Sequence, residues 1–172
     1  MTGRDFARAQ SFWALASEYF ESAATLLAAT GRKAMPILFL QGHAIELALK
    51  SYLISAGLDD GALRGIGHDL VKGMARAKKH GLRTSLSDAQ VSSIRSINSL
   101  YQGKKLEYFY PEPKAFGSLD EMQTIVKTLL NEVFDHVTAP TFDAMRSILN
   151  SSFACDQDNR TFWMIDGQAM ER

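Results

Sequence analysis

Three polar residues, His43, Glu46 and Lys50, stand inside an apolar stretch that runs from Met35 to Ala56. Their spacing of i, i+3 and i+7 places them on one stripe of a helix. If that stripe is buried, the charges need partners, because an unpaired charge in a protein interior costs several kcal/mol. A buried network whose charges are all paired is either purely structural or positions a functional site. The alternative to a buried network is an exposed Glu46–Lys50 pair, which stabilises the helix by about 0.3 kcal/mol. The apolar surroundings favour the buried network.

A second histidine and a carboxylate follow about twenty residues later, as the adjacent pair His68 and Asp69. We therefore predict a buried polar network that consists of His43, Glu46, Lys50, His68 and Asp69. The spacing of His and Glu matches no metal-ligand signature, so we predict neither a metal nor a cofactor. The sequence contains no G-x-S-x-G elbow and no glycine-rich phosphate loop, and Cys155 stands in a polar segment where it is read as incidental.

The charges balance overall, with 19 Lys and Arg against 19 Asp and Glu, but they are unevenly distributed. Residues 61–117 hold ten basic and four acidic side chains, whereas residues 118–172 hold four and nine. The basic segment is interleaved with tyrosines, and this combination suits single-stranded nucleic acid, whose phosphates pair with cations while its bases stack on rings. The alternative is a solvated helix face with rings packed in the core.

Hydrophobic periodicity predicts a helical protein without a sheet, because apolar residues recur every three or four positions and no stretch alternates convincingly. Glycines in one segment and prolines in another predict loops at Asp59–Gly67 and Gln102–Gly117. Capping residues and stop glycines place the main helices at about Asp5–Ala29, Met35–Ala56, Leu70–His80, Ser87–Tyr101 and Ser118–His136.

The sequence changes character after residue 138. Pro140 is expected to end the last main helix, and Phe142–Leu149 is expected to form one more short helix. The tail beyond is polar except for an aromatic cluster at Phe162–Ile165. We therefore divide the chain into an all-α bundle, residues 1–138, and a C-terminal extension, residues 139–172, that packs on the bundle or on a second subunit.

The composition, with 172 residues of which 46% are hydrophobic, is typical of a single globular domain and excludes disordered and disulfide-scaffold proteins. A lone cysteine excludes an internal disulfide and favours a reducing compartment. The longest apolar run, Met35–Leu40, is far shorter than the roughly 20 residues of a membrane-spanning helix, and the first residues do not resemble a signal peptide. We expect a soluble, cytoplasmic protein.

The segment Phe39–Leu53, with the sequence FLQGHAIELALKSYL, and the step Gly67-His68-Asp69-Leu70 together resemble the HEPN domains, helical proteins named for higher eukaryotes and prokaryotes nucleotide binding. The resemblance covers about residues 6–137. It implies an up-and-down bundle of four to five helices that pairs into a homodimer. Many members are metal-independent RNases or toxins or accompany a small nucleotidyltransferase, and others are non-catalytic binding modules.

Active members of that family carry an Arg-x(4–6)-His motif, in which Arg stabilises the scissile phosphate and His moves a proton. No Arg of this chain has a His at that distance; the best match is Arg95, with Tyr101 where the His would stand. The resemblance therefore favours an RNA- or nucleotide-binding surface over a standard active site. That surface would contain Arg95, Asn98, Tyr101, Lys104, Lys105 and Tyr108.

Three functions stay open. The first is a non-catalytic or weakly catalytic HEPN-like module that binds RNA or a nucleotide, within a toxin–antitoxin or defence system. The second is a metal-independent RNase with an atypical active site, for which the catalytic candidates are His43, His68, Arg95 and Tyr101. The third is an adaptor or antitoxin-like partner of another protein, such as a nucleotidyltransferase or a toxin.

Overall fold

The computed structural model describes residues 3–29, 34–106, 118–153, 163–165 and 168–170, with side chains for 5–29, 34–106 and 118–138. These residues form six helices and one two-stranded antiparallel sheet. The elements are α1 (Gly3–Ala28), α2 (Ala34–Ser55), α3 (Asp60–Ile66), α4 (Leu70–Lys79), α5 (Asp88–Tyr101), α6 (Leu119–Phe153), β1 (Trp163–Ile165) and β2 (Gln168–Met170). The chain divides into two compact units, Met1–Thr138 and Ala139–Arg172.

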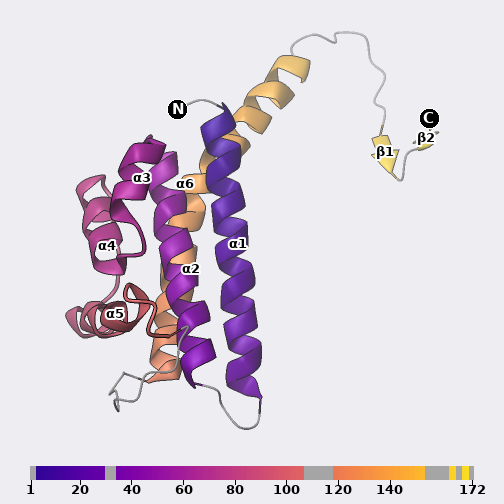
Figure 1. The fold of residues 1–172 in the computed structure, drawn as a ribbon. Helices are drawn as coiled ribbons and strands as arrows, with labels where there is room; N and C mark the ends of the chain where they lie inside the picture. Colours follow the sequence, from indigo (N-terminus) through magenta and orange to yellow (C-terminus); the bar gives the residue numbers. More distant parts are fainter. Residues whose placement is uncertain (1–2, 30–33, 107–117, 154–162, 166–167, 171–172) are drawn as a thin grey trace. The chain divides into compact units, whose positions relative to one another are not determined.

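The first unit is built around three long helices. α1 and α2 run antiparallel, the first part of α6 lies beside them, and α3, α4 and α5 cover one side of α2 (Figure 1). Side chains connect these helices: the Trp13 indole N–H donates to the carbonyl of Leu130 on α6, and the Ser51 hydroxyl donates to the carbonyl of Ala9 on α1. Every element that the structure describes in this unit is a helix, as the sequence predicts.

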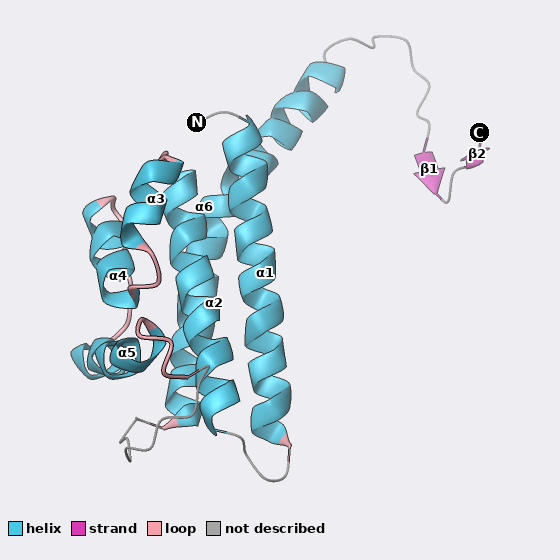
Figure 2. Cartoon of the chain, viewed as in Figure 1, coloured by secondary structure: helices cyan, strands magenta, loops and turns pink. Residues whose placement is uncertain are grey.

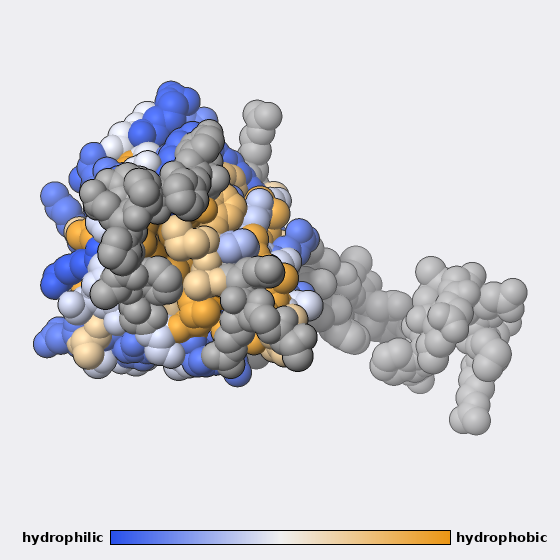
Figure 3. Space-filling view, turned by 60° about the horizontal axis from the view of Figure 1, so that its bottom comes forward, coloured by the Kyte–Doolittle hydropathy of each residue, from blue (hydrophilic) through white to orange (hydrophobic). Residues whose placement is uncertain are grey.

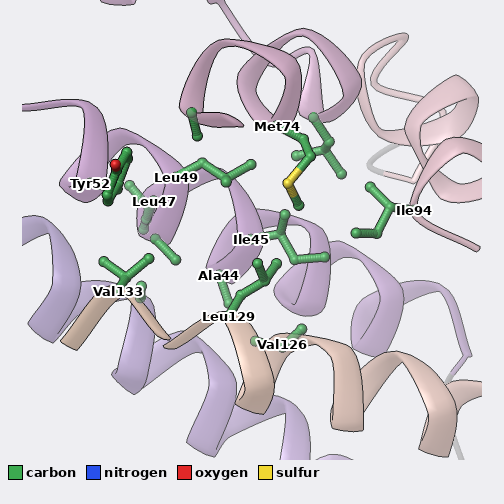
Figure 4. Close-up of a cluster of buried hydrophobic side chains, with 14 of the residues drawn as sticks. Ala44, Ile45, Leu47, Leu49, Tyr52, Met74, Ile94, Val126, Leu129 and Val133 are labelled. Atoms are coloured by element: carbon green, nitrogen blue, oxygen red, sulfur yellow. The ribbon is translucent and has the colours of Figure 1, made fainter. Parts of the chain in front are cut away.

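α2 is the central helix because it is apolar nearly all round its circumference, and fourteen of its 22 residues are buried. Ile45 points toward Met74 of α4 and Ile94 of α5, whereas Ala44 lies on the side of Leu129 of α6 (Figure 4). Among the described helices, α2 alone is long and apolar enough to cross a membrane by length and composition. However, 78% of the apolar stretch of this helix is buried inside the protein, as is usual for a core helix.

Local capping explains where the short helices begin. The Asp69 carboxylate accepts the N–H of Lys72 at the start of α4, and Ser87 forms a capping box with Gln90 at the start of α5, both as predicted. The expected loop at Asp59–Gly67 is wrong, because Asp60–Ile66 forms α3. There Asp59 caps the start of the helix, and Leu63 and Ile66 are buried. These two contributions outweigh the low helix propensity of two internal glycines.

Two expectations for the C-terminal part are also wrong. α6 continues through Pro140 to Phe153, so Phe142–Leu149 belongs to it and is not a separate helix. Proline inside a helix removes one backbone hydrogen bond but can be accommodated, usually as a kink, at a cost of about 3 kcal/mol.

The strands β1 and β2 form an antiparallel pair (Figure 2). In this pair Trp163 lies opposite Met170. Each strand has three residues, too few for alternation to be recognised in a sequence. Cys155 lies outside the described residues.

Candidate functional site

Glu46 is the centre of a polar cluster on α2, and its side chain is only 7% exposed. Its Oε1 accepts a hydrogen bond from Lys50 Nζ at 2.5 Å, and its Oε2 accepts one from the Tyr101 hydroxyl at 2.5 Å. The Nδ1 of His68 lies 3.0 Å from Oε2 and 3.2 Å from Oε1. Three donors therefore converge on one carboxylate, which is the condition under which a buried charge is tolerated.

His43 joins the cluster through Tyr101, because its Nδ1 lies 2.7 Å from the Tyr101 hydroxyl oxygen. The single proton of that hydroxyl is donated to Glu46, so the Nδ1 of His43 must be the donor in this contact. The same reasoning places a proton on Nδ1 of His68, which faces the carboxylate. Two aromatic rings contact the His43 imidazole. The Tyr19 ring meets it edge-on, with 4.4 Å between the ring centres, and the Phe39 ring lies parallel to it, with 5.9 Å between the ring centres.

Glu46 is ionised at neutral pH as a consequence of these contacts. Burial alone raises the pKa of the Glu46 carboxyl, but hydrogen bonds from Lys50, Tyr101 and His68, together with the charge of Lys50, outweigh it. The net result is a pKa below the ordinary value. The cluster therefore holds a stable negative charge, with Lys50 bound to it from one turn further along α2.

Two glycines shape the cluster. A Cβ at Gly42 would lie 2.7 Å from Cδ2 of Tyr101, so the absence of a side chain there makes room for the tyrosine ring beside α2. Gly67 ends α3 with φ of +62°, a conformation that other residues rarely adopt. This turn separates α3 from α4 and precedes His68, whose imidazole reaches back to Glu46.

Asp69 does not join the predicted network. Its carboxylate caps α4 and accepts a hydrogen bond from the Asn98 side-chain amide at 3.1 Å. The carbonyl oxygen of the same amide accepts the N–H of Leu70 at 2.7 Å. Asn98 is 9% exposed and ties α5 to the start of α4, so its predicted place on an RNA-binding surface is wrong. The sequence does not reveal this because the two partners are separated by almost thirty residues.

The structure also separates the other residues of that predicted surface. Tyr101 is 5% exposed and points at Glu46, whereas Arg95 is exposed and lines a small groove of about 140 Å³ between α4 and α5. Six residues at 100° per residue put Arg95 and Tyr101 about 120° apart around α5, so they cannot serve one site. Lys104 is exposed, Lys105 is half-buried, and Tyr108 lies outside the described residues.

The outer side of the cluster forms the wall of a pocket of about 430 Å³. Lys50 and His68 reach this pocket from the cluster, and α1 and α3 supply its other walls. The lining residues are Arg8, Phe12, Lys50, Asp60, Leu63, Arg64, Gly67 and His68. Arg8 bonds Asp60 at 2.5 Å, and its guanidinium carbon lies 5.7 Å from the centre of the Phe12 ring.

The pocket has the chemistry of an anion site. Three cationic side chains and the carboxylates of Asp60 and Glu46 leave one net positive charge. The His68 side chain is 55% exposed and can contact a bound molecule. Arg8 and Phe12 carry no signal in the sequence, because only tertiary packing brings α1 beside α3. In the sequence, Arg64 cannot be distinguished from the many other basic residues.

No protein-family model, curated protein or solved structure matches this chain. The function of the site is therefore argued from its geometry and chemistry. Within the described residues, no group of three or more His, Cys, Asp or Glu side chains is arranged to hold a metal ion.

Proposed function

We propose that this chain is a HEPN-like module that binds RNA or a nucleotide through a phosphate group, in the pocket between α1, α2 and α3. The observation that carries the proposal is the pocket itself, with Arg8, Lys50 and Arg64 on its walls beside His68. Its volume falls within the range of roughly 300–1,000 Å³ that is usual for ligand sites. A phosphate is the ligand group for which guanidinium, ammonium and imidazole donors are best suited.

Glu46 supports this proposal by fixing two of the polar side chains that line the pocket. Lys50 and His68 are both bound to the Glu46 carboxylate, so both side chains are already ordered before a ligand binds. Ordering a long side chain costs about 0.5–1.5 kcal/mol on binding, and a donor that is already held avoids most of that cost. The buried network is thus a structural feature that also positions a binding surface.

Binding of a short single-stranded RNA to the full chain, followed by fluorescence anisotropy between about 50 and 200 mM salt, tests the proposal. Arg64→Ala should weaken binding and lower the salt slope by about 0.7, the value for one phosphate contact on a single strand. Arg76→Ala, which removes an exposed arginine of α4 outside the pocket, is the matched control.

The same assay separates the pocket from the surface predicted on α5. The triple variant Arg95→Ala, Lys104→Ala and Lys105→Ala should bind RNA nearly as well as the natural chain if the phosphates lie in the pocket. If this variant loses binding while Arg64→Ala keeps it, the ligand lies on α5 and the proposed site is refuted.

A second candidate function, cleavage of RNA without a metal, is favoured by one observation. The Glu46 carboxylate holds Nδ1 of His68 while the imidazole is exposed in a cationic pocket, an arrangement that suits a general acid or base. Labelled RNA incubated in EDTA should then be cleaved by the natural chain and by His80→Ala, a control histidine outside the pocket, but not by His68→Ala. Absence of cleavage by the natural chain removes this candidate.

We also propose that the module acts in the cytoplasm as a homodimer, or beside a toxin, antitoxin or nucleotidyltransferase as an adaptor. Hydrophobic surface supports a protein contact: Leu15 is 42% exposed and Phe134 is 39% exposed. Figure 3 shows hydrophobic surface near the centre of one face and hydrophilic surface toward its edges. Light scattering of the purified chain would measure its mass in solution, and a monomer would refute the homodimer but not the adaptor role.

A further inference from the structure

The pocket lining combines two kinds of chemistry. Lys50 and His68 supply polar groups that converge on Glu46, with Lys50 Nζ 2.5 Å from Oε1 and His68 Nδ1 3.2 Å from the same oxygen. Phe12 of α1 supplies an aromatic ring that is only partly buried, with the guanidinium carbon of Arg8 over it at 5.7 Å from the ring centre. A ligand that matches this lining would offer both an anionic group and a flat, apolar group.

The net charge of the pocket limits how many phosphates it can accept. Asp60 is paired with Arg8, and Glu46 is paired with Lys50, so most of the positive charge is already balanced. What remains is one unit of positive charge. This remainder suits a single terminal phosphate monoester, which carries about −1.5 to −2 at neutral pH, whereas a run of phosphodiesters would bring further negative charge against the two carboxylates.

We propose that the pocket binds a single nucleotide with a terminal phosphate monoester, its phosphate beside Lys50, Arg64 and His68 and its base on the Phe12 ring. This inference rests on the proposed function and specifies its ligand. Base–aromatic stacking tolerates every base, so we expect weak discrimination among the four bases. The nucleotide can be free or can be the end of an RNA chain, since both present the same chemistry.

Calorimetric titration of the full chain with adenosine 5′-monophosphate tests the inference. Adenosine, which lacks the phosphate, should bind at least about tenfold more weakly, because hydrogen bonds to a charged group are lost. Ribose 5-phosphate, which lacks the base, should bind about five- to tenfold more weakly, because stacking is lost. Equal affinity for adenosine and its monophosphate would overturn the assignment.

Four variants, one of which is a control, test the phosphate and base contacts. Arg64→Ala should weaken both the monophosphate and ribose 5-phosphate by about tenfold, and Arg76→Ala should weaken neither. Phe12→Leu should weaken the monophosphate but leave ribose 5-phosphate unchanged, and Phe12→Trp should restore binding by keeping an aromatic face. Circular dichroism confirms that each variant is folded. If Phe12→Leu has no effect on the monophosphate, the base does not lie on this ring.

Competition with short RNAs separates the two sources of the nucleotide. RNAs with a 5′- or 3′-terminal phosphate that displace the monophosphate better than the same RNA with hydroxyl ends indicate recognition of a chain terminus. If only free mononucleotides compete, the ligand is a free nucleotide. RNA binding that depends on Arg64 but ignores terminal phosphates and Phe12 overturns this inference and leaves the proposed function standing. Absence of binding to both RNA and the monophosphate refutes both.

Discussion

Replacing Tyr101 by phenylalanine removes one oxygen atom from the centre of the polar cluster. The hydroxyl donates to the buried Glu46 carboxylate at 2.5 Å and accepts from Nδ1 of His43 at 2.7 Å. The ring, which is 5% exposed, keeps its place against Gly42. A hydrogen bond to a charged group contributes about 1.5–3 kcal/mol, so Tyr101→Phe should lower the free energy of unfolding near neutral pH by about 2 kcal/mol.

A second buried tyrosine provides the matched control. The Tyr52 hydroxyl donates to the neutral backbone carbonyl of His80 at 2.9 Å, and Tyr52 is 4% exposed. Because a neutral acceptor gives a hydrogen bond about half as strong as an ionised one, Tyr52→Phe should cost about 1 kcal/mol. Urea unfolding of both variants measures the difference. Equal costs, or a cost of Tyr101→Phe below about 0.5 kcal/mol, would refute the assigned contact with an ionised Glu46.

The pH dependence of the two costs supplies an independent check. The pKa of Glu46 in the folded protein lies below its ordinary value of 4.5, so its contribution to stability is present above that value and is lost as the pH falls through the folded pKa. Removing the Tyr101 donor raises the folded pKa, and the variant has less such stability to lose. The cost of Tyr101→Phe should therefore shrink in acid, while the cost of Tyr52→Phe stays constant.

Two further substitutions test contacts around the cluster. Gly42→Ala places a methyl group 2.7 Å from the Tyr101 ring and should destabilise the protein by about 1–3 kcal/mol, as overpacking does; an unchanged urea midpoint would show that the ring moves freely. Asp69→Ala removes the α4 cap and a partner of Asn98 and should cost about 1–2 kcal/mol. Asp59→Ala, which removes only a cap at α3, should cost less, and the reverse order would contradict the assigned Asn98 contact.

The sequence predicts those features that depend on local geometry. The helix starts at Asp69 and Ser87 follow from capping patterns, and the shared stripe of His43, Glu46 and Lys50 follows from helical spacing. These contacts involve residues within a few positions of each other, so they do not require knowledge of how the helices pack.

Features that depend on packing escape the same reasoning. Tyr101 is 55 residues from Glu46 in the sequence. The direction in which its side chain faces depends on how α5 is rotated about its own axis. That rotation is determined by the packing of the whole core. The same rotation buries Asn98 and exposes Arg95. A basic and aromatic segment therefore looks like one surface in the sequence, although its members are divided between the core and the exterior.

The shared carboxylate of Glu46 would link the stability of the bundle to the proposed binding in the pocket. A phosphate that draws Lys50 or His68 toward itself weakens a hydrogen bond that satisfies a buried charge, and part of the binding free energy must offset that loss. The ligand gains most when the two donors keep their bonds to Glu46 and use their remaining protons, since an ammonium has three. Lys50 can do so without moving, whereas His68 must be protonated on both nitrogens to donate on its exposed side. We therefore expect the proposed phosphate ligand to bind with modest affinity, held mainly by Lys50 and Arg64.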